Sequence, residues 1–481
     1  MSIGKHIEEH IILGGIPKKS QALGYGLSGG TIVLFGDSLT AQGDVTITGG
    51  ATGANPTYTR NACSAFHRAN WRLGCPFTRV INEGTGGDTT TIMANRFAAD
   101  VLSYAPDWLM IMGGINDVTG LTGPLTPAQV QPYVDTAWTN LTGMYSKALN
   151  AGIKVIVCTC YPWKNTSVAD NMAVRSQYTA KLNRKIREYA AETPGVVLFD
   201  GVAALKYWDT VAHDKNTEPD PQFYSSGLVH LNALGGQVLE PILTSALSPV
   251  IKRSHGRNSN GWDGTTGDVD NGLINSAFIG TTGTTVTGSP RITGNIATSW
   301  VLDPYYVALT SATTVVAAKT THWNTDYSTV PVQRVTITRD ATAFIGGEDF
   351  FFSIEEWVAL KQILTLSGSQ FAVGDTVFVE AEVNVTETSG TAASTMILVE
   401  MYDDPFTAVT GNVCANAPAE GTGTTLALVG GKMVDSVIRT PNFAIPASTE
   451  LVKVSLFMLA SVSSEVQWDW ARPQLCKAVN T

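Results

Sequence analysis

The chain has 481 residues, too many for one hydrophobic core, since single cores stop growing near about 250–300 residues. Hydrophobic residues make up 44% of it and charged residues 15%, a composition typical of packed globular domains. The formal net charge of −10 provides no basic field for phosphates, so nucleic-acid binding is disfavoured. No apolar stretch approaches the ~20 residues of a spanning helix, so no membrane span is expected.

Residues 1–29 form a lead segment with no clear structural pattern. They lack the basic-then-apolar order of a secretory signal peptide. The sequence therefore predicts a cytosolic protein, a component of a phage virion or tail, or export by another route. The six cysteines show no paired spacing typical of zinc sites, and we expect them to be free thiols that are mostly buried.

Residues 30–253 alternate short β-branched runs with longer helical patterns, which predicts a parallel sheet with crossover helices. The fold class of this domain is therefore α/β. The expected strands are 31–35, 79–82, 107–113, 154–160 and 196–200. The expected helices are 128–150, about 169–192, and one that follows His230 and runs through Leu247.

Residues 254–261 are rich in Gly, Asn and Ser, a composition typical of a linker. In residues 262–481 helical periodicity nearly vanishes, and short strands separated by turns predict an all-β antiparallel sandwich or jelly roll. The expected strands are 284–286, 313–317, 334–338, 376–385, 395–401, 451–456 and 466–470.

The two ends of this β domain look like the opening and closing segments of a carbohydrate-binding jelly roll. The opening segment is 271–278, and the closing segment is 466–475. We expect Trp300 and at least one of Trp468 and Trp470 to lie in the core.

Four separated segments of the α/β domain fit a single active site. Ser38 directly follows the first strand, at the edge where an open parallel sheet binds ligands, and is the expected nucleophile. Gly87 follows the second strand and Asn116 the third, so the amides of Ser38 and Gly87 and the Asn116 side chain are the expected oxyanion hole. His230, just before the last helix, is the expected general base.

These segments resemble the four blocks of the SGNH hydrolase family, which is named for its Ser, Gly, Asn and His. The family's serine falls on Ser38 in an intact Gly-Asp-Ser-Leu motif, its glycine on Gly87, its asparagine on Asn116 and its histidine on His230. The resemblance covers about residues 30–250. It implies a flavodoxin-like three-layer sandwich, esterase, lipase or carbohydrate-deacetylase activity, and neither a metal nor an organic cofactor.

The family usually carries Asp three residues before the histidine, where this chain has Gly227. Three interpretations remain open. The Gly227 carbonyl accepts the Nδ1 proton of His230, which gives a Ser-His dyad; Asp220 or another acid enters from a neighbouring loop; or the enzyme is weak or inactive. Trp163, after the fourth strand, either lines the acyl pocket or packs on the sheet edge.

Together these features predict a serine O-acyl esterase, in particular an O-acetyl esterase, acting on an acylated carbohydrate or another small ester. The polysaccharide substrate is inferred only from the attached β domain. The alternative within the class is a lipase, thioesterase or general carboxylesterase. The alternative outside it is a glycan-binding phage tail or surface protein whose hydrolase domain has lost activity. An oligomer is compatible with the sequence.

Overall fold

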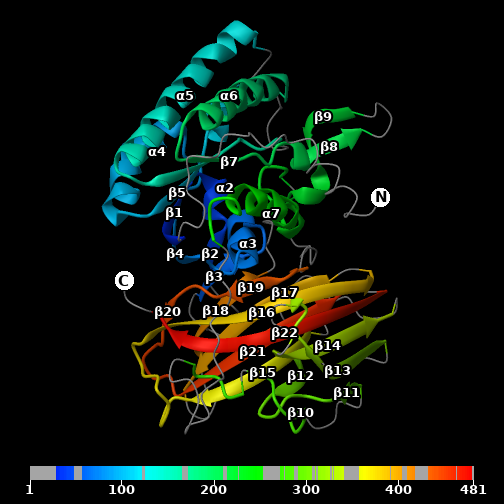
Figure 1. The fold of residues 1–481 in the computed structure, drawn as a ribbon. Coiled ribbons are helices and arrows are strands. Elements are labelled where there is room, and N and C mark those ends of the chain that lie inside the picture. The colour runs from blue at the N-terminus through cyan, green and yellow to red at the C-terminus, as the bar shows by residue number, and fades with distance from the viewer. Residues whose placement is uncertain are drawn as a thin grey trace. The chain divides into compact units, whose positions relative to one another are not determined.

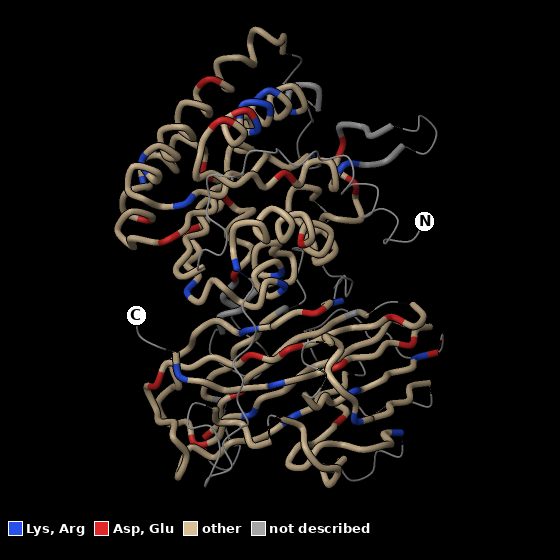
Figure 2. Tube along the Cα trace, in the orientation of Figure 1, with Lys and Arg blue, Asp and Glu red and all other residues tan. Residues whose placement is uncertain are grey.

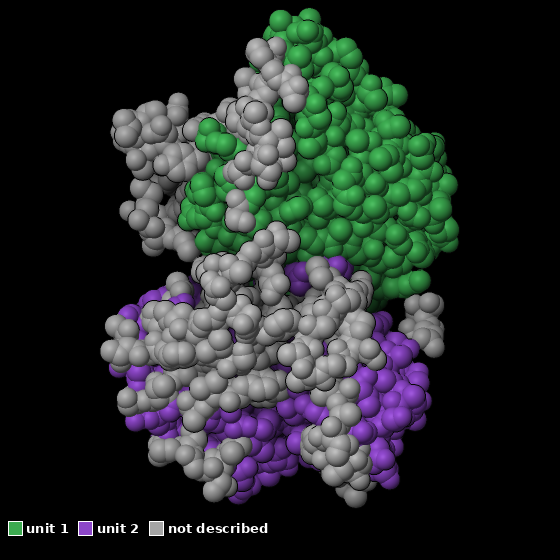
Figure 3. Space-filling view, turned by 180° about the vertical axis from the view of Figure 1, so that it is seen from behind, with its two compact units in different colours: residues 1–43, 63–254, 420–423 green, residues 44–62, 255–419, 424–481 purple. Residues whose placement is uncertain are grey.

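Figure 1 shows the fold of the computed structural model. The residues that it describes are 29–47, 57–121, 125–164, 172–209, 214–225, 227–252, 271–275, 277–285, 291–305, 309, 312–325, 328, 330–340, 357–390, 392–403, 409–417, 432–461 and 463–478. They divide into two compact units (Figure 3). Unit 1 holds the described residues within 1–43 and 63–254, and unit 2 those within 44–62, 255–419 and 424–481.

Unit 1 is built on a parallel sheet that has five strands among the described residues. They are β1 (Gly30–Gly36), β4 (Phe77–Gly84), β5 (Trp108–Met112), β6 (Lys154–Cys158) and β7 (Val196–Phe199). Their order is β4-β1-β5-β6-β7, and every neighbouring pair is parallel. This is the flavodoxin-like order. The chain first adds β4 on one side of β1 and then adds β5, β6 and β7 on the other side, so the switch point of the topology lies beside β1. The predicted strands and fold class are confirmed.

Helices cover both faces of this sheet (Figure 1). On one face lie α4 (Thr90–Asp100), α5 (Pro127–Asn150) and α6 (Met172–Glu192), and on the other lie α3 (Ala65–Arg72) and α7 (Ala233–Leu247). Because both faces are covered, every residue of β5 is buried. Shorter elements are η2 (Leu102–Tyr104), η4 (Ala203–Leu205), β8 (Lys206–Asp209) and β9 (Asp214–Pro219).

The longest helix that the structure describes, α5, begins with a capping arrangement encoded in the sequence. Thr126 Oγ1 accepts a hydrogen bond from Gln129 N, and the Gln129 side chain accepts one from Thr126 N. This reciprocal capping satisfies two backbone donors at the start of α5, and Pro127 occupies the position where a missing N–H costs nothing.

Unit 2 consists mainly of strands, and the described ones form two large sheets. In order, the first sheet contains β10 (Thr284–Thr285), β12 (Val301–Tyr305), β15 (Trp357–Thr365), β21 (Leu451–Ala460), β17 (Ala392–Tyr402), β18 (Val409–Ala417), β3 (Thr57–Asn61) and β2 (Asp44–Ile47). The second contains β11 (Ile292–Gly294), β13 (Thr313–Thr321), β14 (Pro331–Arg339), β22 (Ser464–Lys477), β16 (Thr376–Ser389) and β19 (Ser436–Arg439), with β20 (Phe443–Ala444) on β16. Most pairs are antiparallel, as predicted.

The strands β2 and β3 follow the short helix α2 (Ser38–Ala41) in the chain, yet they belong to unit 2. β2 pairs antiparallel with β3, and β3 pairs parallel with β18, with Thr59 opposite Cys414. The sequence groups residues 30–253 in one domain because composition is a local property. Pairing with a strand far along the chain leaves no trace in local composition.

The two sheets of unit 2 face each other. Trp468 on β22 donates its Nε1 hydrogen to Thr395 Oγ1 on β17, over 2.8 Å. Trp300, Trp468 and Trp470 are fully buried, which confirms their predicted place in the core. Alternate residues of a strand point to opposite faces, so Met396, next to Thr395, points away from this interface.

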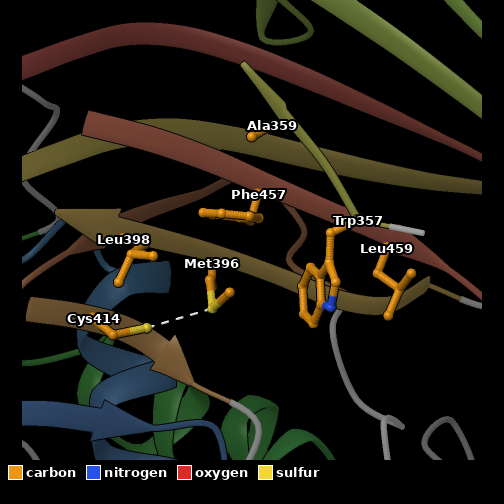
Figure 4. Close-up of a cluster of buried hydrophobic side chains, with 7 residues drawn as sticks. All are labelled: Trp357, Ala359, Met396, Leu398, Cys414, Phe457 and Leu459. Atoms are coloured by element: carbon orange, nitrogen blue, oxygen red, sulfur yellow. Dashed lines mark hydrogen bonds between the residues drawn. The ribbon is translucent and has the colours of Figure 1, made fainter. Parts of the chain in front are cut away.

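That other face of the first sheet carries a buried apolar cluster (Figure 4). Its centre is an edge-to-face contact between the rings of Trp357 and Phe457, whose centroids are 5.7 Å apart. The cluster spans four neighbouring strands, β15, β21, β17 and β18. Its remaining members are Ala359, Met396, Leu398, Cys414 and Leu459. The central strands of this sheet are therefore apolar on both faces.

The cysteines and the charges of the chain match the sequence expectations. All six cysteines are buried and free. Acidic and basic residues are interspersed over the elements of both units (Figure 2). Among the helices described, none is long and apolar enough to cross a membrane.

The packing of unit 2 predicts a large stability difference between two substitutions on adjacent strands. Leu456 is fully buried, so Leu456→Ala should lower the free energy of unfolding of this unit by about 2–5 kcal/mol through a lost transfer term and a cavity. Ile363 is 44% exposed, so Ile363→Ala should change it by less than about 1 kcal/mol. Urea unfolding followed by tryptophan fluorescence measures both, and equal losses would contradict the packing.

Candidate active site

Ser38 begins the short helix α2 (Ser38–Ala41), directly after the carboxyl end of β1. Asp37 caps this helix, and its Oδ1 accepts a hydrogen bond of 2.9 Å from Leu39 N. A Cβ atom at Gly84 would lie 2.2 Å from Ala41 N, so only glycine lets α2 approach the end of β4 this closely. Ser38 is thereby held at the sheet edge where β1, β4 and β5 end.

His230 Nε2 lies 2.9 Å from Ser38 Oγ, although 192 positions separate the two residues in the chain. The loop that carries His230 is fixed on both sides. Ser225 N donates to His230 O over 2.8 Å, and Asn232 caps α7 by accepting a hydrogen bond of 3.0 Å from Gly235 N. The fold therefore brings the predicted nucleophile and the predicted base into hydrogen-bonding contact.

Asn116 and Gly87 lie at the same edge. Asn116 belongs to η3 (Ile115–Val118), after β5, and its Nδ2 donates to Asp88 O over 3.0 Å. Gly87 has φ +84° and open space around its Cβ position, so the backbone conformation requires glycine there. A Cβ atom on Gly86 would lie 4.0 Å from Ser38 Cβ, which puts this loop beside the serine. All four predicted blocks therefore meet at one edge.

Arg96, on α4, connects the segments that form this edge. Its Nε donates to Asp88 Oδ2 over 2.6 Å, next to Gly87. Its Nη2 donates to Gly36 O over 2.8 Å, and its Nη1 donates to Glu83 O over 2.9 Å. One guanidinium thus ties the ends of β1 and β4 to the glycine loop. Sequence reasoning missed it, because an arginine on an amphipathic helix is ordinary and only its contacts distinguish it.

Two further carboxylates beside the site order its loops. Burial raises the pKa of Asp37 to about 7; the hydrogen bond from Leu39 opposes this, and the charges of Asp117 and Asp88 add to it. Asp117 accepts hydrogen bonds from Thr90 Oγ1 (2.6 Å) and Thr90 N (2.9 Å), and burial raises its pKa as well. The site is therefore acidic, and Arg96 is the cation paired with Asp88.

The structure does not bring Asp220 to His230. Asp220 caps η5 (Pro221–Phe223), where its carboxylate accepts hydrogen bonds from Gln222 N (3.2 Å) and Gln222 Nε2 (2.7 Å). Within the described residues, which include Gly227 but not Ser226, no acceptor lies within hydrogen-bonding distance of His230 Nδ1. Burial lowers the pKa of His230. A nearby carboxylate would act in the opposite direction.

Trp163 lies after β6 and is only 4% exposed. The guanidinium carbon of Arg175 lies 4.0 Å from the centre of its ring. Trp163 also forms part of the wall of a pocket between α6 and the ends of β6 and β7. It is both a packed residue at the sheet edge and a wall of that pocket.

A flavodoxin-like parallel sheet with Ser38 and His230 in contact at its carboxyl edge defines a fold of the SGNH hydrolase class. Residues 34–238 match the GDSL-like Lipase/Acylhydrolase family.

Two curated relatives share short segments with the chain. An uncharacterized lipoprotein, YqeF, of Bacillus subtilis is 33% identical over 101 residues, which are 21% of this chain and 40% of the relative. An acetylxylan esterase of Geobacillus stearothermophilus is 37% identical over 93 residues, which are 19% of this chain and 41% of the relative. The chain thus spans about two fifths of the length of these relatives.

Solved structures resemble about half of the chain. A putative acylhydrolase from Bacteroides fragilis aligns with 49% of this chain and 95% of its own, at 19% identity and a TM-score of 0.32. A catalytic mutant of an acetylxylan esterase from Geobacillus stearothermophilus aligns with 48% of this chain and 98% of its own, at 21% identity and a TM-score of 0.32.

The contacts of Arg96 predict an effect on stability that does not depend on any activity. Asp88 is 7% exposed and Arg96 17%, so Arg96→Met leaves a buried carboxylate without its cation and should lower the free energy of unfolding by about 3 kcal/mol. Arg184→Met is the matched control, because Arg184 and its partner Glu188 are 71% and 59% exposed. It should cost less than about 1 kcal/mol.

Urea unfolding measures both variants, and the double variant Arg96→Met/Asp88→Asn isolates the pair. If the buried charge causes the loss, neutralising Asp88 should recover part of the stability. An Arg96→Met variant as stable as Arg184→Met would refute the role of Arg96 as a clamp.

Proposed function

We propose that the chain is a serine ester hydrolase that removes O-acetyl or other short acyl groups from a polysaccharide. The observation that carries the proposal is the 2.9 Å contact between Ser38 Oγ and His230 Nε2, beside the Asn116 side chain and the Gly87 loop. Nucleophile, base and donors for a developing oxyanion are the parts that acyl transfer requires. The match of residues 34–238 to an acylhydrolase family supports the same reaction class.

In the proposed reaction, Ser38 Oγ attacks the ester carbonyl while its proton passes to His230 Nε2. The negative charge on the tetrahedral oxygen is stabilised by the N–H groups of Ser38 and Gly87 and by Asn116 Nδ2. The intermediate then expels the sugar alcohol, which takes the proton from His230. A water molecule, activated by His230, attacks the acyl-serine and releases the carboxylic acid and free Ser38.

We infer that Ser38 and His230 act as a dyad rather than as part of a triad with Asp220. The Asp220 carboxylate is engaged by Gln222, and burial lowers the pKa of His230, opposite to the effect of a carboxylate partner. In the dyad the Gly227 carbonyl takes over the orienting role after a small movement of the loop or through water.

The polysaccharide substrate is supported by two observations of different kinds. The described elements of unit 2 are strands, and in this proposal unit 2 holds the polymer while unit 1 cleaves the ester, an inference by analogy of architecture. A relative with 37% identity over 93 residues is an acetylxylan esterase. The sequence alternative of an inactive, glycan-binding protein makes the opposite prediction for ester hydrolysis.

The first test of the proposal is hydrolysis of p-nitrophenyl acetate. Replacing the nucleophile by Ser38→Ala should lower kcat by about 10⁴-fold or more, because the acyl-serine can no longer form. Ser245→Ala is the matched control, since Ser245 is exposed on α7. It should retain full activity. A folded wild type that hydrolyses neither this ester nor acetylated polysaccharides would reject the esterase and favour the inactive binding protein.

The pH dependence separates a dyad from a triad. His230 must be neutral to accept the serine proton, and burial lowers its pKa below the ordinary value of 6.5. The neutral base therefore persists to lower pH, and the acidic limb of the kcat/KM profile should be centred below pH 6.5. A carboxylate at Nδ1 would raise the pKa instead. An acidic limb of the profile centred above pH 6.5 would contradict the dyad.

A further inference from the structure

The pocket beside Trp163 is a cavity of unit 1, between α6 and the segments that follow β6 and β7. Its volume is about 160 Å³, which suits a carboxylate group with its first waters and not a polymer chain. Three cationic side chains line it, namely Arg175, Arg187 and Lys206. The mechanism proposed for Ser38 uses none of them.

The described residues that line this cavity include three cations and no acid. Asp200 accepts two hydrogen bonds from Arg187, from Nε (2.6 Å) and from Nη2 (3.0 Å), and neutralises that guanidinium. Among the side chains that the structure describes, no ion pair joins Lys206 to an acid, and Asp200 acts on it only through its charge. Burial and the charge of Arg187 lower its pKa, and Asp200 only partly opposes them. An anion in the cavity would relieve this excess of positive charge.

The wall of the cavity is shaped by a stacked pair. The Arg175 guanidinium carbon lies 4.0 Å from the centre of the Trp163 ring, and both side chains are almost completely buried. A guanidinium fixed on an aromatic face keeps its geometry without a further loss of side-chain freedom. Arg175 is therefore preorganised in the wall of the cavity, which Lys206 also lines.

The cavity lies at the same sheet edge as Ser38. Strands in the order β1-β5-β6-β7 lie about 4.8 Å apart, so the ends of β6 and β7 are about 10–14 Å from the end of β1. The segment after β6 is also joined to the His230 loop. Tyr224 OH donates to Pro162 O over 2.5 Å, and Lys164 N donates to Leu228 O over 2.9 Å.

We propose that this cavity, lined by Trp163, Arg175, Arg187 and Lys206, binds a carboxylate carried by a sugar neighbouring the acylated one, so that the substrate is an acidic polysaccharide. The inference rests on the proposed esterase function and narrows its substrate class. The strand spacing puts the cavity about 10–14 Å from Ser38 along the sheet edge. A group in the cavity therefore belongs to a sugar beyond the one whose ester is cleaved. The cation side chains then act on substrate affinity and leave the acyl chemistry to Ser38 and His230.

The test uses the full chain and two forms of one polymer. O-acetylated polygalacturonate carries free carboxylates, and the same polymer after methyl esterification of those carboxylates is neutral. Release of acetate alone is measured for both. The wild type should have a higher kcat/KM on the acidic polymer. In Lys206→Gln the ratio of acidic to neutral kcat/KM should fall about 10-fold, as expected for loss of one charged hydrogen bond.

Two further variants control for charge and fold. Lys206→Arg keeps the cation and should retain most of the ratio. Lys147→Gln removes an exposed cation on α5 and should leave both activities unchanged. A ratio unaltered in Lys206→Gln, or lowered equally by Lys147→Gln, would overturn the proposal.

A binding measurement distinguishes failure of the subsite from failure of the esterase. Ser38→Ala is titrated with tri-galacturonate by calorimetry, with and without the added substitution Lys206→Gln. Binding that weakens about 10-fold with Lys206→Gln supports the subsite even if no ester is cleaved. Equal binding by both, or a site filled as well by sodium acetate as by tri-galacturonate, would overturn a substrate-borne carboxylate as the ligand.

Discussion

Parallel pairing of β4, β1 and β5 is the constraint on which the site depends. It aligns the carboxyl ends of three strands at one edge of the sheet, so that the residues after each strand become neighbours. Ser38 follows β1, Gly87 follows β4 and Asn116 follows β5. Only His230 comes from elsewhere, and its loop is fixed by the start of α7 and by hydrogen bonds to the segment after β6.

Three acidic side chains lie close together at the same edge of the sheet, and Arg96 is important because it pairs with one of them. Asp37, Asp88 and Asp117 lie in or beside the loops that form the site, and burial raises the pKa of two of them. The Arg96 guanidinium compensates Asp88 while it binds the ends of two strands. Arg96 thus both compensates a buried charge and holds the loops of the site in place. The conformation of these loops should therefore depend strongly on this single residue.

The elements of unit 1 could be predicted because their signals are local. Short β-branched runs, periodic helices and the motif at Ser38 can each be recognised within a window of a few residues. In unit 2, β15 (Trp357–Thr365) was missed because its apolar residues do not alternate with polar ones. The pairing of β3 with β18 was missed because strand pairing between distant segments has no local signal.

The candidate site could be predicted as a set of residues but not as a network. Ser38, Gly87, Asn116 and His230 were identified from position and residue type, and the structure brings them together. The contacts of Arg96 depend on where a helix packs, which no spacing reveals. The replacement of the usual acid by Gly227 was visible in the sequence, whereas the engagement of Asp220 with Gln222 required coordinates.

Activation of Ser38 by His230 is tested most directly by reaction of the full chain with a p-nitrophenyl alkylphosphonate, followed by peptide mass spectrometry. A serine whose proton is taken by His230 should acquire a single phosphonyl group per chain, on Ser38, and the reaction should be slowed about 10³-fold or more in His230→Ala. Modification of another residue, or equal labelling of Ser38 in wild type and His230→Ala, would contradict the pairing of these two side chains.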